Sequence, residues 1–308
     1  MLSFAGIDVA KNSLAIHVRP RNVVFSAPNT AQGHAEIVRC LAELEVEKVL
    51  LEATGGYEKR IVKALVQAGF NVCLADPLRA RKFAEAMGKQ AKTDPIDAAM
   101  LAEYAEKLEH FAPQTHCPAR DELRELVQVR DRLVQQRDDE KRRRQKAFCE
   151  QAIAVFDAHI AYLRDQIKYL ESEIDRIMKT LDSDKARRLL AVKGLGRITA
   201  ASLLSYLPEL GALQRGQIAA LVGVAPYNRD SGKHEGKRQI KGGRGKLRRV
   251  LYMATWAMIR YNHEFSTRYK GLTARGKCAK VALVACMRIL IVRLNAMMRD
   301  GVEWREQA

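Results

Sequence analysis

The chain has 308 residues, of which 47% are hydrophobic; this excludes a disordered protein and allows two or three domains. Its net charge of +17 is unevenly distributed, because residues 1–112 contain 14 basic and 14 acidic side chains and residues 113–308 carry the whole excess. A basic half beside a neutral half favours a polyanionic partner, most often a nucleic acid, although a ribosome-like or merely soluble basic surface has the same composition.

Residues 1–112 alternate between strand and helix patterns. The expected order is strands at 3–10, 13–19 and 22–27, a helix at 31–45, a strand at 48–54, a helix at 57–68, a strand at 70–77 and a helix at 92–108. The last helix begins with Thr93, Asp94 and Pro95, a favourable capping and first-turn set. Three meandering strands followed by this alternation predict an α/β domain with a mixed sheet.

Residues 119–193 contain neither Gly nor Pro and are rich in Glu, Arg, Leu and Gln. Their apolar side chains follow a heptad spacing, at Phe156, Ile160, Leu163, Ile167, Leu170, Ile174, Ile177 and Leu181. This pattern predicts a coiled coil, closed either as a hairpin within one chain or as a dimer between two chains. A shorter apolar seam at 123–134 precedes it, and the polar run 137–146 is expected to separate the two.

Residues 189–308 are predicted to be mostly helical. Segment 281–294 is the most apolar of the chain, but Arg288 and Arg293 interrupt it, so it is expected to be a buried helix and not a membrane span. The six cysteines form no CxxC pair and no zinc-ligand cluster, which favours free thiols. Because the N-terminus also lacks the pattern of a signal peptide, a cytoplasmic protein is expected.

Four carboxylates occupy positions that are expected to bring them together at one edge of the sheet, as a metal site requires. Asp8 lies in the first strand, Glu52 ends an apolar strand, and Asp94 and Asp97 are three residues apart at a helix start, so they face the same way. Carboxylates gathered at one sheet edge repel each other, and Mg²⁺ or Mn²⁺ is the natural neutralising ion. For Asp94 alone a simple helix cap is the better interpretation, but the set favours a metal site.

The basic half contains two candidate phosphate-binding features. Residues 193–196 (KGLG) form a tight turn between helices, which is either a helix-hairpin-helix-like grip on a nucleic-acid backbone or an ordinary helical turn. Residues 228–249 contain nine Lys or Arg side chains against two acids. The residues predicted to contact nucleic acid are Lys193, Gly194, Gly196, Lys237, Arg238, Lys241, Arg244, Lys246, Arg248 and Arg249.

Ser231 lies inside this basic loop, next to Gly232. A Ser-Gly pair in a polar stretch is common in turns, and this is the more economical interpretation when the loop is taken alone. A serine nucleophile needs a base or a metal to activate it, and the loop contains neither. The acidic residues of the first domain are the evident source of such activation.

The motifs GIDVAK (6–11), EATGGYE (52–58) and KTDPIDAAMLAEYA (92–105), followed by VKGLGRITA (192–200), LVGVAPYNRDSGK (221–233) and GRGKLRRVLYMA (243–254), resemble the DEDD transposases of bacterial insertion sequences. The resemblance extends over essentially the whole chain. It implies an RNase H-like domain at 1–115, a coiled-coil or oligomerisation region at 116–185 and a helical transposase domain at 186–308.

By this resemblance, Asp8, Glu52, Asp94 and Asp97 are the metal set and Ser231 is the catalytic serine. The family implies a recombinase that acts on donor and target DNA, is guided by a bridge RNA, and assembles as a dimer or tetramer. The serine would form a phosphoserine link to DNA while Mg²⁺ or Mn²⁺ assists, in a site composed from two domains. Two alternatives remain: a metal-dependent junction nuclease in which Ser231 is idle, and a nucleic-acid-binding protein without enzymatic activity.

Overall fold

The computed structural model describes residues 2–53, 55–88, 93–107, 117–228, 236 and 238–305. The chain divides into two compact units, Met1–Cys117 and Pro118–Ala308. The second unit contains both the region expected as a coiled coil and the region expected as a transposase domain.

The first unit is an α/β domain, and its mixed sheet confirms the expected fold class of this region. Its strands are β1 (Ser3–Val9), β2 (Ser13–Arg19), β3 (Val23–Pro28), β4 (Val46–Glu52) and β5 (Asn71–Ala75). Its helices are α1 (Ala31–Glu43), α2 (Lys59–Gln67), α3 (Pro77–Ala86) and α4 (Asp94–Lys107). Helix α3 is absent from the sequence-based expectation, although Asp76 caps it and Pro77 occupies its first turn, the same Asp-Pro signal that marks α4.

The sheet has the strand order β3-β2-β1-β4-β5. Strands β1, β2 and β3 form an antiparallel meander, whereas β4 pairs parallel with β1 and β5 pairs parallel with β4. Ile7 of β1 lies opposite Leu51 of β4, so the carboxyl ends of these two strands, with Asp8 and Glu52, reach the same edge of the sheet.

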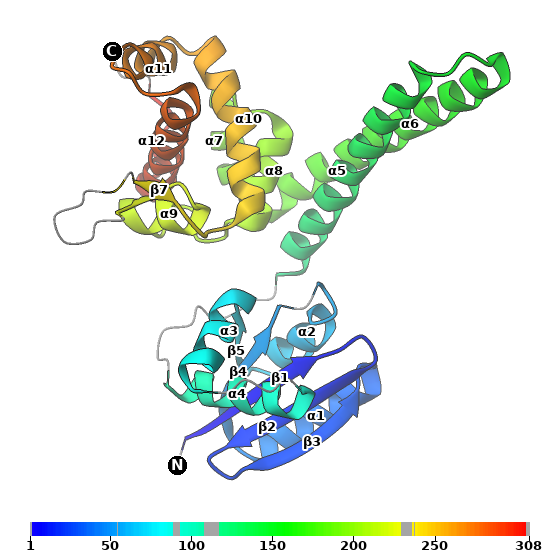
Figure 1. The fold of residues 1–308 in the computed structure, drawn as a ribbon, viewed down its shortest axis with the longest axis vertical. Coiled ribbons are helices and arrows are strands. Elements are labelled where there is room, and N and C mark those ends of the chain that lie inside the picture. Colours follow the sequence, from blue (N-terminus) through cyan, green and yellow to red (C-terminus); the bar gives the residue numbers. More distant parts are fainter. Residues whose placement is uncertain are drawn as a thin grey trace. The chain divides into compact units, whose positions relative to one another are not determined.

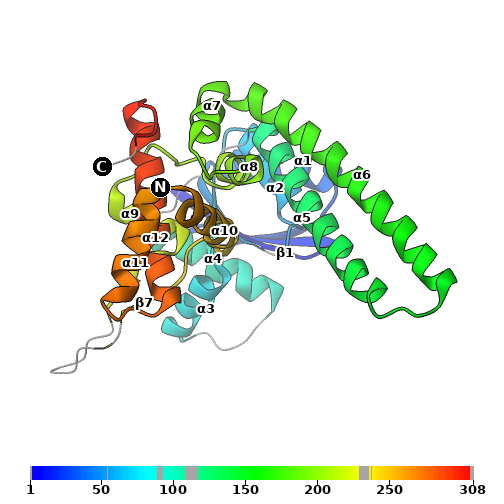
Figure 2. The same cartoon turned by 90° about the horizontal axis from the view of Figure 1, so that it is seen from above.

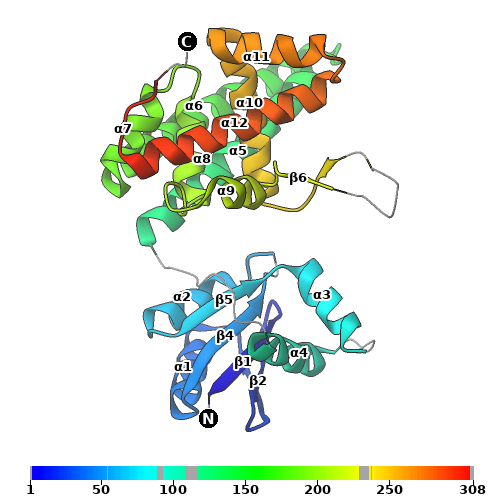
Figure 3. The same ribbon diagram turned by 90° about the vertical axis from the view of Figure 1, so that its left-hand side faces the viewer.

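Helices cover both faces of the sheet, α1 and α2 on one side and α3 and α4 on the other (Figure 3). Alternate residues of β1 such as Ala5, Ile7 and Val9 pack toward α1 and α2 in the larger core. The opposite face packs against α3 and α4 through residues such as Leu50, Cys73 and Leu101. Asp8 belongs to this second face because it alternates with Ile7 and Val9.

The second unit is predominantly helical (Figure 1). Its helices are α5 (Pro118–Arg144), α6 (Glu150–Leu181), α7 (Ser183–Ala191), α8 (Arg197–Tyr206), α9 (Arg215–Val222), α10 (Gly245–Tyr261), α11 (His263–Ala274) and α12 (Ala279–Asp300). Two short strands, β6 (Pro226–Tyr227) and β7 (Gln239–Ile240), pair antiparallel between α9 and α10. One hydrophobic core joins α7 to α12 with the adjoining parts of α5 and α6.

Helices α5 and α6 form a long antiparallel hairpin (Figure 2). Arg130 of α5 donates to Glu171 of α6 at 2.7 Å, and Arg144 pairs with Asp157 at 2.9 Å near the turn. Six heptad residues of α6, Ile160, Leu163, Ile167, Leu170, Ile174 and Ile177, are buried within this one chain. The heptad seam therefore closes as an intramolecular hairpin, and the polar run expected to divide two seams is itself helical up to Arg144.

Helix α12 is long and apolar enough to cross a membrane by length and composition alone, and it is the one such helix in the part of the chain that the structure describes. Its apolar side chains, among them Leu283, Leu290 and Leu294, are fully buried against the other helices of the unit. Asn295 is also buried, where its side chain accepts from the amide of Gly211 and donates to the carbonyl of Leu213. The helix is thus accounted for as a core helix, as the sequence predicts.

Candidate carboxylate site and nucleic-acid interface

The direction of α4 follows from contacts at its two ends. Near its C-terminus, Glu106 accepts a hydrogen bond from Arg19, which pairs across the sheet with Phe4 at the start of β1. In the middle of the contact, a Cβ atom on Gly6 would lie 2.2 Å from the carbonyl oxygen of Ala98. The helix therefore runs antiparallel to β1, and its first turn lies over the end of β1 that carries Asp8.

Asp8, Glu52, Asp94 and Asp97, here called the acidic cluster, are brought together by this packing. Burial and the negative charges of Asp94 and Asp97, with a smaller effect of Glu52, raise the pKa of Asp8 to about 6. Asp8, Glu52 and Asp97 are half-buried, whereas Asp94 is exposed. A carboxylate whose charge is disfavoured by its neighbours is a site where a cation gains free energy on binding.

The acidic cluster fits a divalent cation by its chemistry more than by its present geometry. Four carboxylates supply the hard oxygen donors that Mg²⁺ and Mn²⁺ prefer. Within the described ranges, however, no three His, Cys, Asp or Glu side chains are already arranged to hold an ion. The effect of the other three carboxylates on the pKa of Asp8 shows that the four groups lie near one another.

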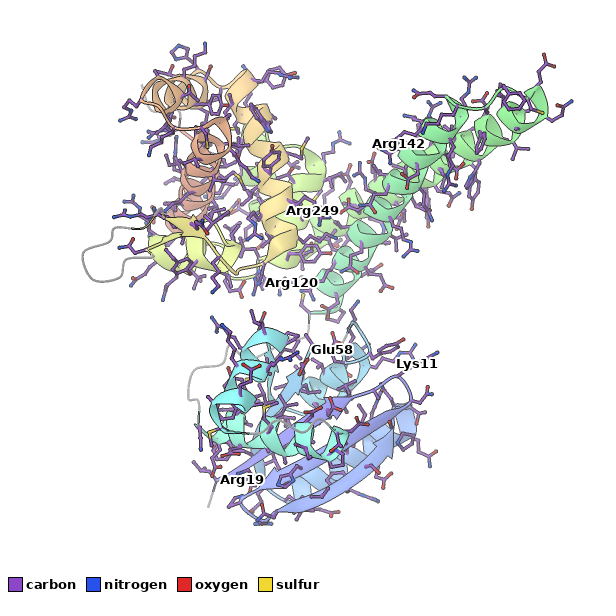
Figure 4. All side chains as sticks on the ribbon, viewed as in Figure 1. Lys11, Arg19, Glu58, Arg120, Arg142 and Arg249 are labelled. Atoms are coloured by element: carbon purple, nitrogen blue, oxygen red, sulfur yellow. The ribbon has the colours of Figure 1, made fainter. Side chains whose placement is uncertain are left out.

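A hydrogen-bonded group fixes the segments that follow β1 and β4. Asn29 donates through Nδ2 to the carbonyls of Ala10 and Tyr57, at 3.0 and 3.4 Å, and its Oδ1 lies 2.7 Å from Nε2 of His34. Burial and the charge of Arg60 lower the pKa of His34, so its imidazole is neutral at pH 7. The sequence does not indicate this hydrogen-bonded group, because an asparagine before a helix predicts only a turn. Lys11 and Glu58, which follow the same two strands, are labelled in Figure 4.

The KGLG turn links α7 to α8, as expected. Gly194 has a φ of 95°, a conformation that favours glycine, and a Cβ there would also lie 2.9 Å from Sδ of Met258 on α10. Gly196 is different, because it precedes the first turn of α8 with open space around it. Lys193 is exposed beside it. Of the three residues expected to contact nucleic acid in this turn, Lys193 and Gly196 are exposed and Gly194 is half-buried.

The loop that carries Ser231 emerges from the β6–β7 pair. Ser231 and Lys237 lie outside the described residues, as do Arg229 and Lys233. The stem of the loop is well defined by two glycines in close contact, because a Cβ on Gly243 would lie 2.3 Å from the backbone nitrogen of Gly223. Both have positive φ, 80° for Gly223 and 72° for Gly243, a conformation that favours glycine.

Three of the predicted phosphate contacts are engaged within the protein. Arg244 forms two short hydrogen bonds to the Glu209 carboxylate, at 2.7 and 2.6 Å, and a third to the carbonyl of Tyr206. Arg248 donates to the carbonyls of Gly223 and Gly242 and so joins the two sides of the loop stem. Lys246 lies 2.7 Å from the Tyr206 hydroxyl and 3.5 Å from Asp131. Arg238, Lys241 and Arg249 are instead exposed to solvent.

A mixed sheet with carboxylates at its edge, joined to a basic helical unit, is the layout of an enzyme that processes nucleic acid. Family models agree with this class. A transposase model of the DEDD type matches residues 5–150, and the model "Transposase IS116/IS110/IS902 family" matches residues 186–270. The two matches together cover well over half of the chain, which therefore belongs to the IS110 family of transposases.

Individual relatives resemble this chain over most of its length. The pilin gene-inverting protein of Moraxella lacunata is 26% identical over 97% of this chain and 96% of its own. The transposase for insertion sequence element IS1328 of Yersinia enterocolitica is 26% identical, covering 81% of this chain and 82% of its own. The transposase for IS1111A of Coxiella burnetii is 24% identical over 74% and 70% of the two chains. The chain is thus a DNA recombinase of the transposase type, and the reading as a non-enzymatic binding protein is set aside.

Proposed function

We propose that this transposase cuts and rejoins DNA through Ser231, with a divalent cation held by the acidic cluster. The observation that carries the proposal is the packing of α4 against β1, which brings the four carboxylates of the DEDD set together. In this arrangement burial, together with the charges of Asp94, Asp97 and Glu52, raises the pKa of Asp8. The strand order of the first unit, with two parallel strands added to an antiparallel meander, supports an RNase H-like fold for this domain.

In this proposal the four carboxylates of the acidic cluster bind the metal ion. Asp8 and Glu52, at the ends of neighbouring parallel strands, and Asp94 and Asp97, on the first turn of α4, would hold Mg²⁺ or Mn²⁺. Such an ion supplies Lewis-acid stabilisation of the charge that develops on the phosphate during displacement. Gly6 lets α4 approach β1 and so keeps the two pairs of carboxylates together.

The covalent step is a transesterification. The Oγ of Ser231 attacks the phosphorus of a DNA phosphodiester, the P–O bond to one sugar breaks, and a P–Oγ bond forms. The serine proton leaves with the attack, and the departing sugar oxygen takes up a proton. Rejoining reverses the exchange, when a sugar hydroxyl of another strand attacks the phosphoserine and restores the serine. Since one ester is exchanged for another, no external energy source is needed.

The same family resemblance supports a bridge RNA as guide and a dimer or tetramer as the working assembly. The inner heptad seam of α6 is already filled by α5, so another surface would join the copies. Val155, Tyr162 and Tyr169 lie on α6 at seven-residue spacing and are 68%, 60% and 61% exposed. We place self-association on this outer stripe of α6. A cytoplasmic site of action stays a prediction from the sequence.

The competing function is a metal-dependent junction nuclease that does not use Ser231. The test is incubation of labelled DNA with the protein and Mg²⁺, followed by denaturing electrophoresis. A protein–DNA adduct that requires both Ser231 and Asp97 supports the recombinase proposal. Metal-dependent cleavage without an adduct would favour the nuclease.

A further inference from the structure

One face of α10 combines exposed aromatic and basic side chains. Arg249, Tyr252, Trp256 and Arg260 are spaced by three, four and four residues, so they lie along one stripe of the helix, here called the α10 stripe. The opposite face, with Leu247, Leu251, Ala254 and Met258, is buried in the core. Tyr252 and Trp256 are each 38% exposed, and Met253 beside them is 65% exposed.

The aromatic rings of the stripe form a supported platform. Trp256 packs edge to face with Tyr252, at 6.5 Å between ring centroids, and it is tilted against Tyr269 of α11 at 5.6 Å. These contacts orient the indole ring and still leave more than a third of its side chain in contact with solvent. If Trp256 and Tyr252 served only to pack the core, we would expect them to be buried further, because large aromatic side chains stabilise a core mainly through the apolar surface that they bury.

The charged side chains of α10 itself are all of one sign. The sequence of α10 contains four basic residues and no Asp or Glu. Lys246 and Arg248, near its start, are held by Asp131 and by backbone carbonyls. Arg249 and Arg260 are exposed, and within the described part of the chain no ion pair engages either of them. The stripe therefore presents two available guanidinium groups on either side of two aromatic rings.

We propose that the α10 stripe binds unpaired nucleotides of an RNA, with bases stacking on Trp256 and Tyr252 and phosphates held by Arg249 and Arg260. This rests on the proposed function, in which a folded RNA is a partner. Bases of duplex DNA are stacked and paired, whereas RNA loops and bulges expose bases that stack on aromatic side chains and arginine planes. A second copy of the same stripe is a poor partner, because its like charges would repel.

The experiment measures affinity of the full-length protein by fluorescence anisotropy, in EDTA and at one fixed salt concentration. Three labelled probes are compared: a 12-nucleotide unstructured RNA, the same sequence as single-stranded DNA, and a DNA duplex. Trp256→Leu should weaken RNA binding roughly 5- to 150-fold, which corresponds to about 1–3 kcal/mol for the loss of one stacked base, and leave duplex binding unchanged within about twofold. Trp256→Phe keeps an aromatic face and should retain most of the affinity.

A matched control is available on the same helix. Tyr261→Leu removes an aromatic ring that is 60% exposed but lies away from the stripe, and it should leave RNA binding unchanged. Tyr252→Leu gives a second test of the platform should Trp256→Leu disturb its packing on Tyr269. Circular dichroism spectra and melting temperatures select the variants that remain folded.

Three outcomes would overturn the inference: unchanged RNA affinity in folded Trp256→Leu and Tyr252→Leu, an equal loss on duplex, or a loss confined to the DNA oligonucleotide. A fall in oligomeric mass with no change in RNA affinity would identify the stripe as a protein interface instead. Equal losses on RNA and single-stranded DNA reflect stacking itself and support the inference. Because the assay needs neither metal nor Ser231, its result does not depend on whether the proposed recombination chemistry is correct.

Discussion

Gly6 of β1 and Ala98 of α4 are in backbone contact, because the carbonyl oxygen of Ala98 lies 2.2 Å from the position that a Cβ of Gly6 would take. The amide nitrogen of Ala102 is equally close to that position. Both neighbours are main-chain atoms, which cannot rotate away as a side chain would. The same contact fixes the first turn of α4 above Asp8. Both the packing of this domain and the arrangement of the acidic cluster therefore depend on the absence of a side chain at Gly6.

Gly6→Ala is therefore expected to destabilise the first unit by about 1–3 kcal/mol or more, since α4 must move away from the sheet. The shift should also separate Asp97 from Asp8 and abolish metal-dependent DNA cleavage. Chemical denaturation followed by circular dichroism measures the first effect, and cleavage of labelled DNA measures the second.

Gly216→Ala is the matched control, because Gly216 lies in α9 with open space around its Cβ position. This change should leave stability unaltered or raise it by up to about 1 kcal/mol, as is usual for glycine in a helix. If Gly6→Ala were equally harmless, the close approach of α4 would have no energetic role.

Asp8→Asn should raise the melting temperature in EDTA, in a pH-dependent way. Burial and its acidic neighbours raise the pKa of Asp8 from 3.8 to about 6 in the folded protein. The folded state therefore holds a proton that the unfolded state releases between about pH 4 and 6, and wild-type stability falls as the pH rises through this window. The advantage of the Asn variant should be absent near pH 4 and complete above pH 6. Glu47→Gln, at the other end of β4, should show no such gain in melting temperature.

Mg²⁺ or Mn²⁺ should reverse this ranking. The ion neutralises the acidic cluster, so wild type should gain melting temperature with ion concentration at pH 7.5, and Asp8→Asn or Asp97→Asn should gain much less. Calorimetric titration provides an independent measure of affinity. Equal responses of wild type and both variants to the ion would remove the metal-site proposal.

The first unit illustrates what sequence periodicity conveys well. Alternation in β1 places Ile7 and Val9 on one face and Asp8 on the other, and the apolar run ending in Glu52 marks a strand buried on both faces. The Asp-Pro pair at the start of α4 predicts that helix correctly. The identical pair at Asp76 was assigned to the end of a strand, so α3 was not predicted. No local pattern indicates that Gly6 lies under a helix that begins almost ninety residues later, because that contact is tertiary.

The basic loop illustrates the opposite limit. Charge density predicts phosphate contacts for Arg244 and Arg248 as readily as for Lys241 and Arg249. Their partners, Glu209 and the carbonyls of Gly223 and Gly242, are distant in sequence or belong to the backbone, so composition alone could not separate structural arginines from available ones. Burial raises the pKa of Glu209, but its hydrogen bonds to Arg244 hold it below its usual range.

Salt dependence of DNA binding should distinguish these two kinds of basic residue. Arg238→Gln combined with Lys241→Gln should reduce the slope of log affinity against log salt by up to about one unit for each lost contact. Arg244→Gln should leave the slope nearly unchanged and instead lower stability, by about 1–3 kcal/mol, because it leaves Glu209 without its hydrogen-bond partner. A reduced slope for Arg244→Gln at wild-type stability would contradict this division.

Substitutions on the two faces of α6 should have different consequences. Ile174→Lys places a charge where the side chain is fully buried against α5, so it should unfold the hairpin at a cost of several kcal/mol. Tyr162→Lys with Tyr169→Lys changes only exposed positions and should reduce oligomeric mass while the melting temperature is retained. Light scattering and circular dichroism together separate the cases. Unchanged mass in the folded double variant would assign assembly to another surface.

Ser231→Ala should abolish both recombination and the covalent protein–DNA adduct, with nucleic-acid affinity nearly intact. The substitution removes a nucleophilic hydroxyl but no charge, and charge dominates affinity for DNA. Asp97→Asn should abolish the adduct as well, because stabilisation of the transition state is assigned to the metal. Ser172→Ala, which alters an exposed serine of α6, should retain full activity. The measurement is denaturing electrophoresis of end-labelled DNA incubated with protein, Mg²⁺ and guide RNA. If Ser231 were only a turn residue, its loss would cost about 1 kcal/mol of local stability and recombination would persist. A labelled protein band at the wild-type level in Ser231→Ala would refute the nucleophile and leave the metal-dependent nuclease as the better account of the acidic cluster.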